Sequence, residues 1–248
     1  MEQIRATRFN LLPPVVKNLL IINGLFFLAT IAIGRAYQID LNTLLGLHYF
    51  ESQAFRPYQF VSYMFMHGSF THLLFNMFAL WMFGYMLENI WGGKRFLIYY
   101  LITALGAALM HTLVQYIEIT QLKSALSPEN INEIYEFGRQ TLMSNKNYSN
   151  PAMGQMNLIL NTPTVGASGA VFGILLAFGM LFPNSVIYIY FLLPIKAKWF
   201  VIIYGALELF SGLANSGDNI AHFAHLGGMI FGFILIKFWN KTLKNKFY

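Results

Sequence analysis

Long apolar stretches constrain this chain more than any other feature of its sequence. A helix rises about 1.5 Å per residue, so about 20 apolar residues are needed to cross the roughly 30 Å hydrocarbon core of a bilayer. Six stretches have this character, and we expect each to be a spanning helix of one all-α, six-transmembrane-helix bundle. They lie at about 15–35, 69–88, 96–117, 164–182, 199–214 and 219–238.

The composition agrees with a polytopic membrane protein. Of the 248 residues, 56% are hydrophobic and only 10% are charged, whereas soluble domains carry about 25% charged residues. This composition excludes an ordinary soluble enzyme and a disordered regulator. Because the chain has no cysteine, thiol nucleophiles, Cys-ligated zinc and iron–sulfur clusters are excluded as well, and any chemistry must use other side chains.

The distribution of Lys and Arg predicts the orientation in the membrane. With six spans and the N-terminus inside, eleven of the 16 basic residues fall on inner segments and five on outer segments. We therefore expect a multi-pass protein of the plasma (bacterial inner) membrane with both termini cytoplasmic. The first stretch could also be read as a signal peptide, but an uncleaved span keeps the charge pattern consistent. The net charge of +6 reflects this anchoring, and no nucleic-acid partner is expected.

These spans divide the chain into three parts. We predict a cytoplasmic N-terminal segment (1–14), a single six-span membrane domain (15–240) and a basic cytoplasmic tail (241–248). Two outer segments of the membrane domain are long, and they cover residues 36–66 and 118–162.

The two outer segments differ in character. Residues 36–66 mix aromatic residues with few charges, which suits a loop at the lipid interface. Residues 118–162 are polar over a longer stretch. Within them Ser127-Pro128-Glu129 places a cap, a first-turn proline and a first-turn acid in order, which predicts a short amphipathic helix on the membrane surface.

Polar side chains inside spans are costly to bury, so they mark candidate functional sites. In the second span His72 and Asn76 are four residues apart and share a helix face, as do His222 and His225 in the sixth. Ser168 lies in a Gly-Ala-Ser-Gly stretch that begins the fourth span. Each signal alone is compatible with simple helix packing. Together they place a serine and a histidine at similar depth, and this geometry allows His225 to take the proton of Ser168.

Other hydrolytic sites fit this sequence less well. The only aspartates, Asp40 and Asp218, lie outside the spans, the zinc motif His-Glu-x-x-His is absent, and Ser168 does not stand in Gly-x-Ser-x-Gly. Glu208, near the middle of the fifth span, is expected to face the bundle interior, either protonated or hydrogen-bonded. We expect no acid to orient His225, because an ionised aspartate would be costly to bury. A Ser-His dyad that needs neither metal nor cofactor remains.

Four motifs occur in order on the expected spans: the run from His67 to Asn76, Glu88 with Trp91-Gly92, the run from Gly166 to Gly169, and the run from Ala221 to Gly228. In this order they resemble the rhomboid intramembrane serine proteases, specifically the six-span bacterial form. The resemblance implies that Ser168 is the nucleophile and His225 its general base. It also implies that His72, Asn76 and the backbone N–H of Ser168 line an oxyanion hole. The implied substrates are single-span membrane proteins in the lipid bilayer, cut in or near their transmembrane segments.

The chain departs from this family at two places. Tyr58-Gln59 stand where members often have Trp-Arg, so we expect different contacts to fix the first outer segment. Phe172 replaces a tyrosine and keeps a ring that can stack on His225. We interpret His222 and Glu88 as structural polar residues, His222 hydrogen-bonded at the outer end of the bundle and Glu88 capping loop backbone.

A non-enzymatic interpretation competes with the protease. A non-catalytic rhomboid-like protein could bind membrane helices, or a transporter could use four histidines as a polar or metal site. Such a site gives no role to Ser168 or Asn76, which favours the protease. The four histidines are His67, His72, His222 and His225.

Overall fold

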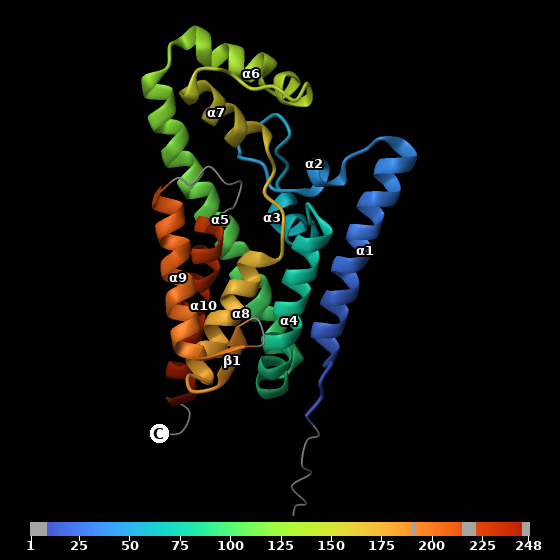
Figure 1. Cartoon of the computed structure of the whole chain (residues 1–248), viewed down its shortest axis with the longest axis vertical. Coiled ribbons are helices and arrows are strands. Elements are labelled where there is room, and N and C mark those ends of the chain that lie inside the picture. The colour runs from blue at the N-terminus through green and yellow to red at the C-terminus, as the bar shows by residue number, and fades with distance from the viewer. Residues whose placement is uncertain (1–8, 190–191, 215–221, 245–248) are drawn as a thin grey trace, which may run out of the picture.

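Six apolar helices run side by side along the long axis of the molecule, alternately up and down (Figure 1). The computed structural model describes residues 9–189, 192–214 and 222–244. The six helices are α1 (Pro14–Tyr37), α4 (Phe70–Trp91), α5 (Gly93–Ala125), α8 (Ser168–Leu181), α9 (Ala197–Ala214) and α10 (His222–Lys244).

Five of these helices are long and apolar enough to cross a membrane, which confirms the predicted all-α membrane bundle. Some sequence predictions fall on parts of the chain outside the described residues. They concern residues 1–8 of the N-terminal segment, residues 219–221 of the sixth span and residues 245–248 of the tail.

The fourth span is shorter than predicted. Helix α8 has 14 residues and is therefore only about 21 Å long. The prediction that this helix begins at residue 164 is wrong, because Thr164 instead exchanges two backbone hydrogen bonds with Leu47, at 2.8 and 2.9 Å. Gly166 then has a φ of +129°, which is incompatible with a continuing helix. The chain thus enters α8 as an extended segment, and the helix begins at Ser168.

Helix α8 lies at the centre of the bundle and is buried along most of its length (Figure 1). It approaches α10 so closely that a Cβ atom on Gly228 would lie 1.9 Å from the carbonyl oxygen of Gly169. Backbone contact of this kind is what small residues permit in membrane helices. The glycine-rich faces of the two helices therefore determine how the start of α8 meets the start of α10.

A polar cap stands on one end of the bundle. It consists of the last turns of α5, α6 (Pro128–Met143) and α7 (Pro151–Asn161), and it packs around its own hydrophobic cluster, which includes Ile119, Ile134 and Met156 (Figure 1). Helix α6 is the predicted amphipathic helix, and the Ser127 hydroxyl caps it by accepting from the backbone N–H of Asn130. Helix α7 was not predicted.

The first outer segment lies beneath this cap. It contains α2 (Leu41–Leu45), α3 (Gln59–Ser62) and a short 3-10 helix, Tyr63–Phe65. The fully buried Gln59 holds the segment together. Its amide donates to the carbonyls of Leu44 and Ala54, and its oxygen accepts from the N–H groups of His48 and Arg56. Gln59 thus supplies the different contacts expected where family members often have Trp-Arg.

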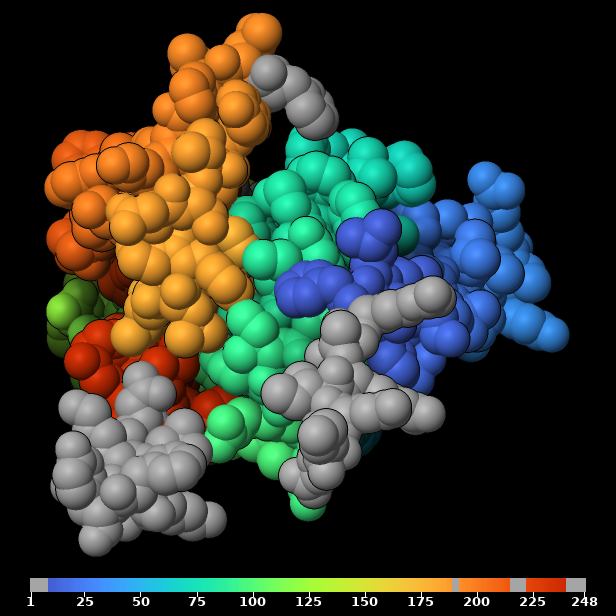
Figure 2. Space-filling model, turned by 90° about the horizontal axis from the view of Figure 1, so that it is seen from below, coloured from blue at the N-terminus to red at the C-terminus, as the bar shows by residue number. Residues whose placement is uncertain are grey.

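The opposite end of the bundle, here called the hairpin end, carries a two-stranded antiparallel hairpin that was not predicted. It is made by β1 (Val186–Ile189) and β2 (Leu193–Lys196), and it projects at the edge of the molecule (Figure 2). The first turn of α1 also lies at this end, where the Glu88 carboxylate accepts from the N–H groups of Val15 and Val16 at 2.9 and 2.8 Å. Glu88 is therefore structural, as expected, but it caps the start of helix α1 rather than loop backbone.

Candidate active site

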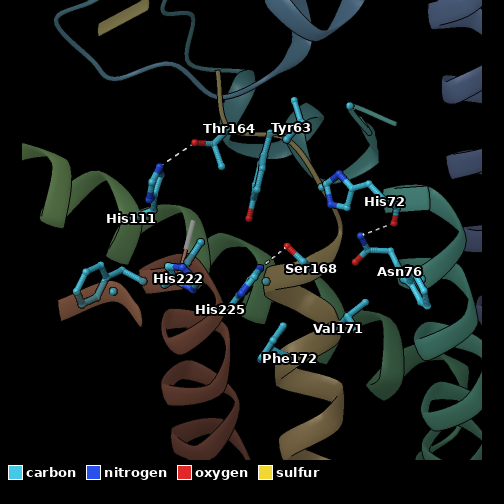
Figure 3. A pocket seen from close by; sticks show the side chains of 18 of the residues that line it. Tyr63, His72, Asn76, His111, Thr164, Ser168, Val171, Phe172, His222 and His225 are labelled. Carbon is cyan, nitrogen blue, oxygen red and sulfur yellow. Dashed lines mark hydrogen bonds between the residues drawn. The ribbon is translucent and has the colours of Figure 1, made fainter. Parts of the chain in front are cut away.

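Ser168 and His225 meet between the start of α8 and the start of α10 (Figure 3). The hydroxyl oxygen of Ser168 lies 2.9 Å from Nε2 of His225, which is hydrogen-bonding distance. His225 is only 9% exposed, and Ser168 faces a cavity. The sequence places the two residues 57 positions apart, and the glycine contact between α8 and α10 brings them together.

An aromatic ring from α8 fixes the plane of the His225 imidazole. Phe172, one turn after Ser168, lies parallel to the imidazole with ring planes 5° apart and ring centroids 4.2 Å apart. Tyr204 of α9 stacks on Phe172 at 5.1 Å. The predicted stacking is therefore present, and it limits rotation of His225 about its side-chain bonds.

The expectation that no acid orients His225 is wrong. Oε2 of Glu208, from α9, lies 2.8 Å from Nδ1 of His225 and 2.7 Å from Nδ1 of His222. Glu208 is 8% exposed, so it faces the bundle interior and is hydrogen-bonded, as the sequence predicted. An unpartnered buried carboxylate would be costly, and here two imidazole donors offset that cost.

These contacts specify the tautomer of both imidazoles. An ionised carboxylate accepts hydrogen bonds and donates none, so Nδ1 of each histidine must carry its proton when Glu208 is charged. This leaves Nε2 of His225 without a proton and able to accept from the Ser168 hydroxyl. A hydrogen-bonded chain thus runs from Ser168 through His225 to Glu208, with His222 on the same carboxylate oxygen.

His72 lies beside Ser168 from the direction of α4 (Figure 3). A Cβ atom on Gly166 would lie 2.8 Å from Nε2 of His72 and 3.5 Å from the hydroxyl oxygen of Ser168. The two side chains therefore converge on the same face of Gly166. Because Ser168 is the first residue of α8, its backbone N–H is also one that the helix itself does not use.

Asn76 lines the same cavity one helical turn further along α4. Its side-chain amide donates to the backbone carbonyl of His72 at 3.0 Å (Figure 3). The structure thus brings His72, Asn76 and Ser168 to one cavity, with the Asn76 amide bonded to its own helix.

The cavity has a volume of about 1030 Å³ and extends from Ser168 toward both the cap and the apolar face of α4. Residues of the cap form part of its wall, among them Glu118 of α5 and Gln155 and Leu158 of α7. A cavity of this volume can hold several residues of an extended peptide. The contribution of α7 was missed, because nothing in the sequence indicated that this helix folds back over the bundle.

The four-histidine metal site of the competing interpretation is not formed among the described residues. His67 packs against His72 with ring centroids 5.0 Å apart, and the group whose possible ligand atoms converge is instead Glu208 with His222 and His225. The Glu208 oxygen lies within 2.8 Å of both nitrogens. This is shorter than the spacing of about 3.3 Å between ligands held 2.0–2.1 Å from a tetrahedral zinc ion. Hydrogen bonding explains the cluster better than metal ligation.

The residues of this site lie within a long part of the chain that is similar to known proteins. Residues 18–247 match the family described as "Eukaryotic integral membrane protein (DUF1751)". The chain is 25% identical over 183 residues to Rhomboid protein 1, mitochondrial, of Saccharomyces cerevisiae, a match that covers 73% of this chain and 42% of the relative.

Two further relatives come from a plant and a bacterium. RHOMBOID-like protein 12, mitochondrial, of Arabidopsis thaliana is 26% identical over 233 residues, which is 94% of this chain and 60% of the relative. Rhomboid protease AarA of Providencia stuartii is 29% identical over 185 residues, which is 69% of this chain and 52% of the relative. The chain therefore spans less than two thirds of the length of each of these three relatives.

Proposed function

This chain belongs to the family of eukaryotic integral membrane proteins (DUF1751) and, with its relatives, to the rhomboid family, and we propose that it is an intramembrane serine protease. Its substrates are single-span membrane proteins, which it cuts in or near their transmembrane segments. The observation that carries this proposal is the contact between Ser168 and His225 at the edge of a cavity large enough for a peptide.

The reaction follows from the geometry of this contact. Ser168 attacks the scissile carbonyl while its proton passes to Nε2 of His225, which later delivers that proton to the leaving amine. A water molecule then hydrolyses the acyl-enzyme by the same route. The side chains of His72 and Asn76 and the backbone N–H of Ser168 donate to the oxyanion, and each such donor can contribute about 3 kcal/mol in a water-excluded site.

The substrate must present an extended segment to this cavity. A helical peptide has its carbonyls bonded within the helix, so the segment near the cut has to unwind before Ser168 can reach it. Substrates with Gly or Pro near the cut unwind most easily. The cap residues that line the cavity then lie beside the part of the substrate that emerges from the membrane.

The charge distribution supports one orientation in the membrane. Lys94 and Arg95 at the start of α5, and Lys196 and Lys198 around the start of α9, lie at the hairpin end. By the positive-inside rule we infer that this end is cytoplasmic, with both termini in the cytoplasm and the cap on the outer side of the plasma membrane.

Labelling by a serine-directed fluorophosphonate tests the proposal most directly. The wild-type protein should be labelled and should cleave a model single-span substrate in proteoliposomes, and Ser168→Ala should do neither. His225→Ala should also abolish cleavage, and the double variant should be no worse than either single variant, because the pair acts as one unit. Full cleavage by Ser168→Ala would show that Ser168 is not the nucleophile. A wild-type protein that binds substrate without labelling or cleavage would instead support a non-catalytic relative.

A further inference from the structure

We propose that Glu208 is a positioning residue for catalysis and that the site works as a Ser168–His225–Glu208 triad in which His222 holds the acid. The inference rests on the proposed protease function and goes beyond the Ser-His dyad that the sequence implied. Glu208 does not line the cavity, so it would act on the substrate only through His225.

Two hydrogen bonds and one stacked ring orient the His225 imidazole. The two hydrogen bonds of His225 leave opposite sides of its ring, at 2.9 Å from Nε2 to the Ser168 hydroxyl oxygen and at 2.8 Å from Nδ1 to the Glu208 carboxylate. With Phe172 stacked on its face, the imidazole has both its plane and its rotation within that plane fixed. A dyad without an acid would have only the Ser168 hydrogen bond to limit rotation within that plane.

Glu208 also lies where positive charge develops on His225. When His225 takes the serine proton it becomes an imidazolium in a side chain that is only 9% exposed, where an uncompensated charge is costly. The Glu208 carboxylate lies beside Nδ1 and neutralises this charge as it develops, while in the resting state it selects the tautomer whose Nε2 accepts from Ser168. Other imidazoles near His225 belong to His72, His111 and His222, and none of them can supply a negative charge.

His222, which has no role in a dyad, contacts Glu208 as well. Its Nδ1 donates to the same Oε2 that accepts from His225, at 2.7 Å, and its ring lies perpendicular to that of His225. Two donors from one turn of α10 therefore hold a carboxylate from α9 in a single orientation. Removal of His222 should lower turnover less than removal of Glu208, because one of the two donors remains.

Glu88 offers a matched control for Glu208. Both are buried carboxylates within the bundle that accept two N–H donors, but Glu88 caps α1 at the hairpin end, far from Ser168. Glu88→Gln and Glu208→Gln remove the same charge from the interior. A purely structural role for Glu208 predicts that the two variants lose folded protein alike and keep the same turnover per folded molecule.

We would measure kcat and KM for a model single-span substrate in proteoliposomes, normalised to the folded fraction. Glu208→Gln should lower kcat by about 10²- to 10⁴-fold with KM changed by less than about 3-fold, since amide replacement of a triad acid leaves the geometry but favours the wrong tautomer. Glu208→Asp should recover part of that loss, and Glu88→Gln should keep the wild-type kcat. Glu208→Gln with kcat within about 3-fold of wild type would overturn the proposal.

Two further measurements separate this proposal from other outcomes. Nitrogen-15 NMR of histidine-labelled protein in micelles should show His225 protonated at Nδ1 in wild type and shifted toward Nε2 protonation in Glu208→Gln. This measurement requires no cleavage, so it separates the two proposals. A wild-type protein without Ser168-dependent turnover would contradict the protease function. The tautomer of His225 would still show whether Glu208 accepts a hydrogen bond from its Nδ1. Loss of activity with a chelator and recovery with Zn²⁺ would show that the cluster is a metal site and overturn the triad.

Discussion

Phe172 lies flat against the imidazole of His225, with ring planes 5° apart and ring centroids 4.2 Å apart. The ring comes from the same helix as Ser168, one turn further along. The helix that supplies the proposed nucleophile therefore also supplies a surface that fixes the proposed base, and a movement of α8 would displace both residues together.

Phe172→Leu should lower kcat by about 3- to 10-fold, because a stacked aromatic pair contributes about 0.5–1.5 kcal/mol beyond its buried area. Phe172→Tyr should retain full activity, since the stacking ring remains. Phe178→Leu is the matched control, because Phe178 is an equally buried ring of α8 near the hairpin end, packed on Phe83 and away from His225. Equal loss of kcat in Phe172→Leu and Phe178→Leu would indicate a general packing effect and contradict a specific role of the stack.

Gly166→Ala should inactivate the protein while Gly92→Ala should not. Both glycines have positive φ, +129° and +77°, so both substitutions strain the backbone. At Gly166 the new methyl would also meet the His72 ring at 2.8 Å, whereas at Gly92 it would meet nothing within 4 Å. We expect both variants to lose stability and only Gly166→Ala to lose fluorophosphonate labelling per folded molecule. Normal labelling of folded Gly166→Ala would show that His72 can move without disturbing Ser168.

The hydropathy of the sequence predicted the helix bundle because it constrains each apolar stretch separately. Each stretch of about 20 apolar residues must be helical in lipid, where backbone groups find no water, so the number and order of the helices follow without any tertiary contact. The entry to α8 could not be predicted this way. Residues 164–166 are apolar enough to continue the helix, but the backbone pairing of Thr164 with the distant Leu47 and the hydrogen bond from the Gly166 N–H to the Tyr63 carbonyl hold them out of it.

The sequence predicted the pairing of Ser168 with His225 because glycine-rich faces indicate which helices approach closely. It missed the contact of Glu208 with His225, since the rotation of α9 about its own axis depends on packing that a hydropathy pattern does not encode. One signal was present. An acid in the middle of a span must find donors inside the bundle, and the neighbouring span offered two histidines on one face.

Asn76→Ala should leave a slow but measurable enzyme, because removing one oxyanion donor costs about 10²- to 10³-fold in kcat and leaves the nucleophile intact. In the structure the Asn76 amide donates to the carbonyl of His72, so it has to turn toward the substrate as the oxyanion forms. Asn76→Asp keeps the shape but removes the donor and should be at least as slow. Turnover of Asn76→Ala within about 3-fold of wild type would show that the amide stays on its own helix and that His72 serves the oxyanion without it.

The stability of the cap should fall in acid because of Glu51, which lies in the first outer segment. Its carboxylate accepts from Lys123 of α5 at 2.6 Å and from the Tyr135 hydroxyl of α6, so it connects three parts of the outer surface. Burial alone would raise its pKa, but the hydrogen bonds from Lys123 and Tyr135 outweigh burial and lower the pKa of Glu51 below its ordinary value of 4.5. A depressed pKa means that this stabilisation is complete above about pH 4.5 and is lost as the pH falls through the lower, folded value.

Hydrogen exchange of α6 and α7 in micelles, compared at pH 7 and pH 3 after correction for intrinsic exchange rates, measures this effect. Wild type should lose protection in the cap at pH 3 before it loses protection in α4. Glu51→Gln should have a less protected cap at pH 7 and a smaller further loss in acid, because the amide has no charge to neutralise. Exposed Glu129 lies in the first turn of α6, whereas the ion pair of Lys123 is with Glu51, so Glu129→Gln should retain most of the acid sensitivity. A cap that opens in acid to the same extent in wild type and Glu51→Gln would show that another group controls it.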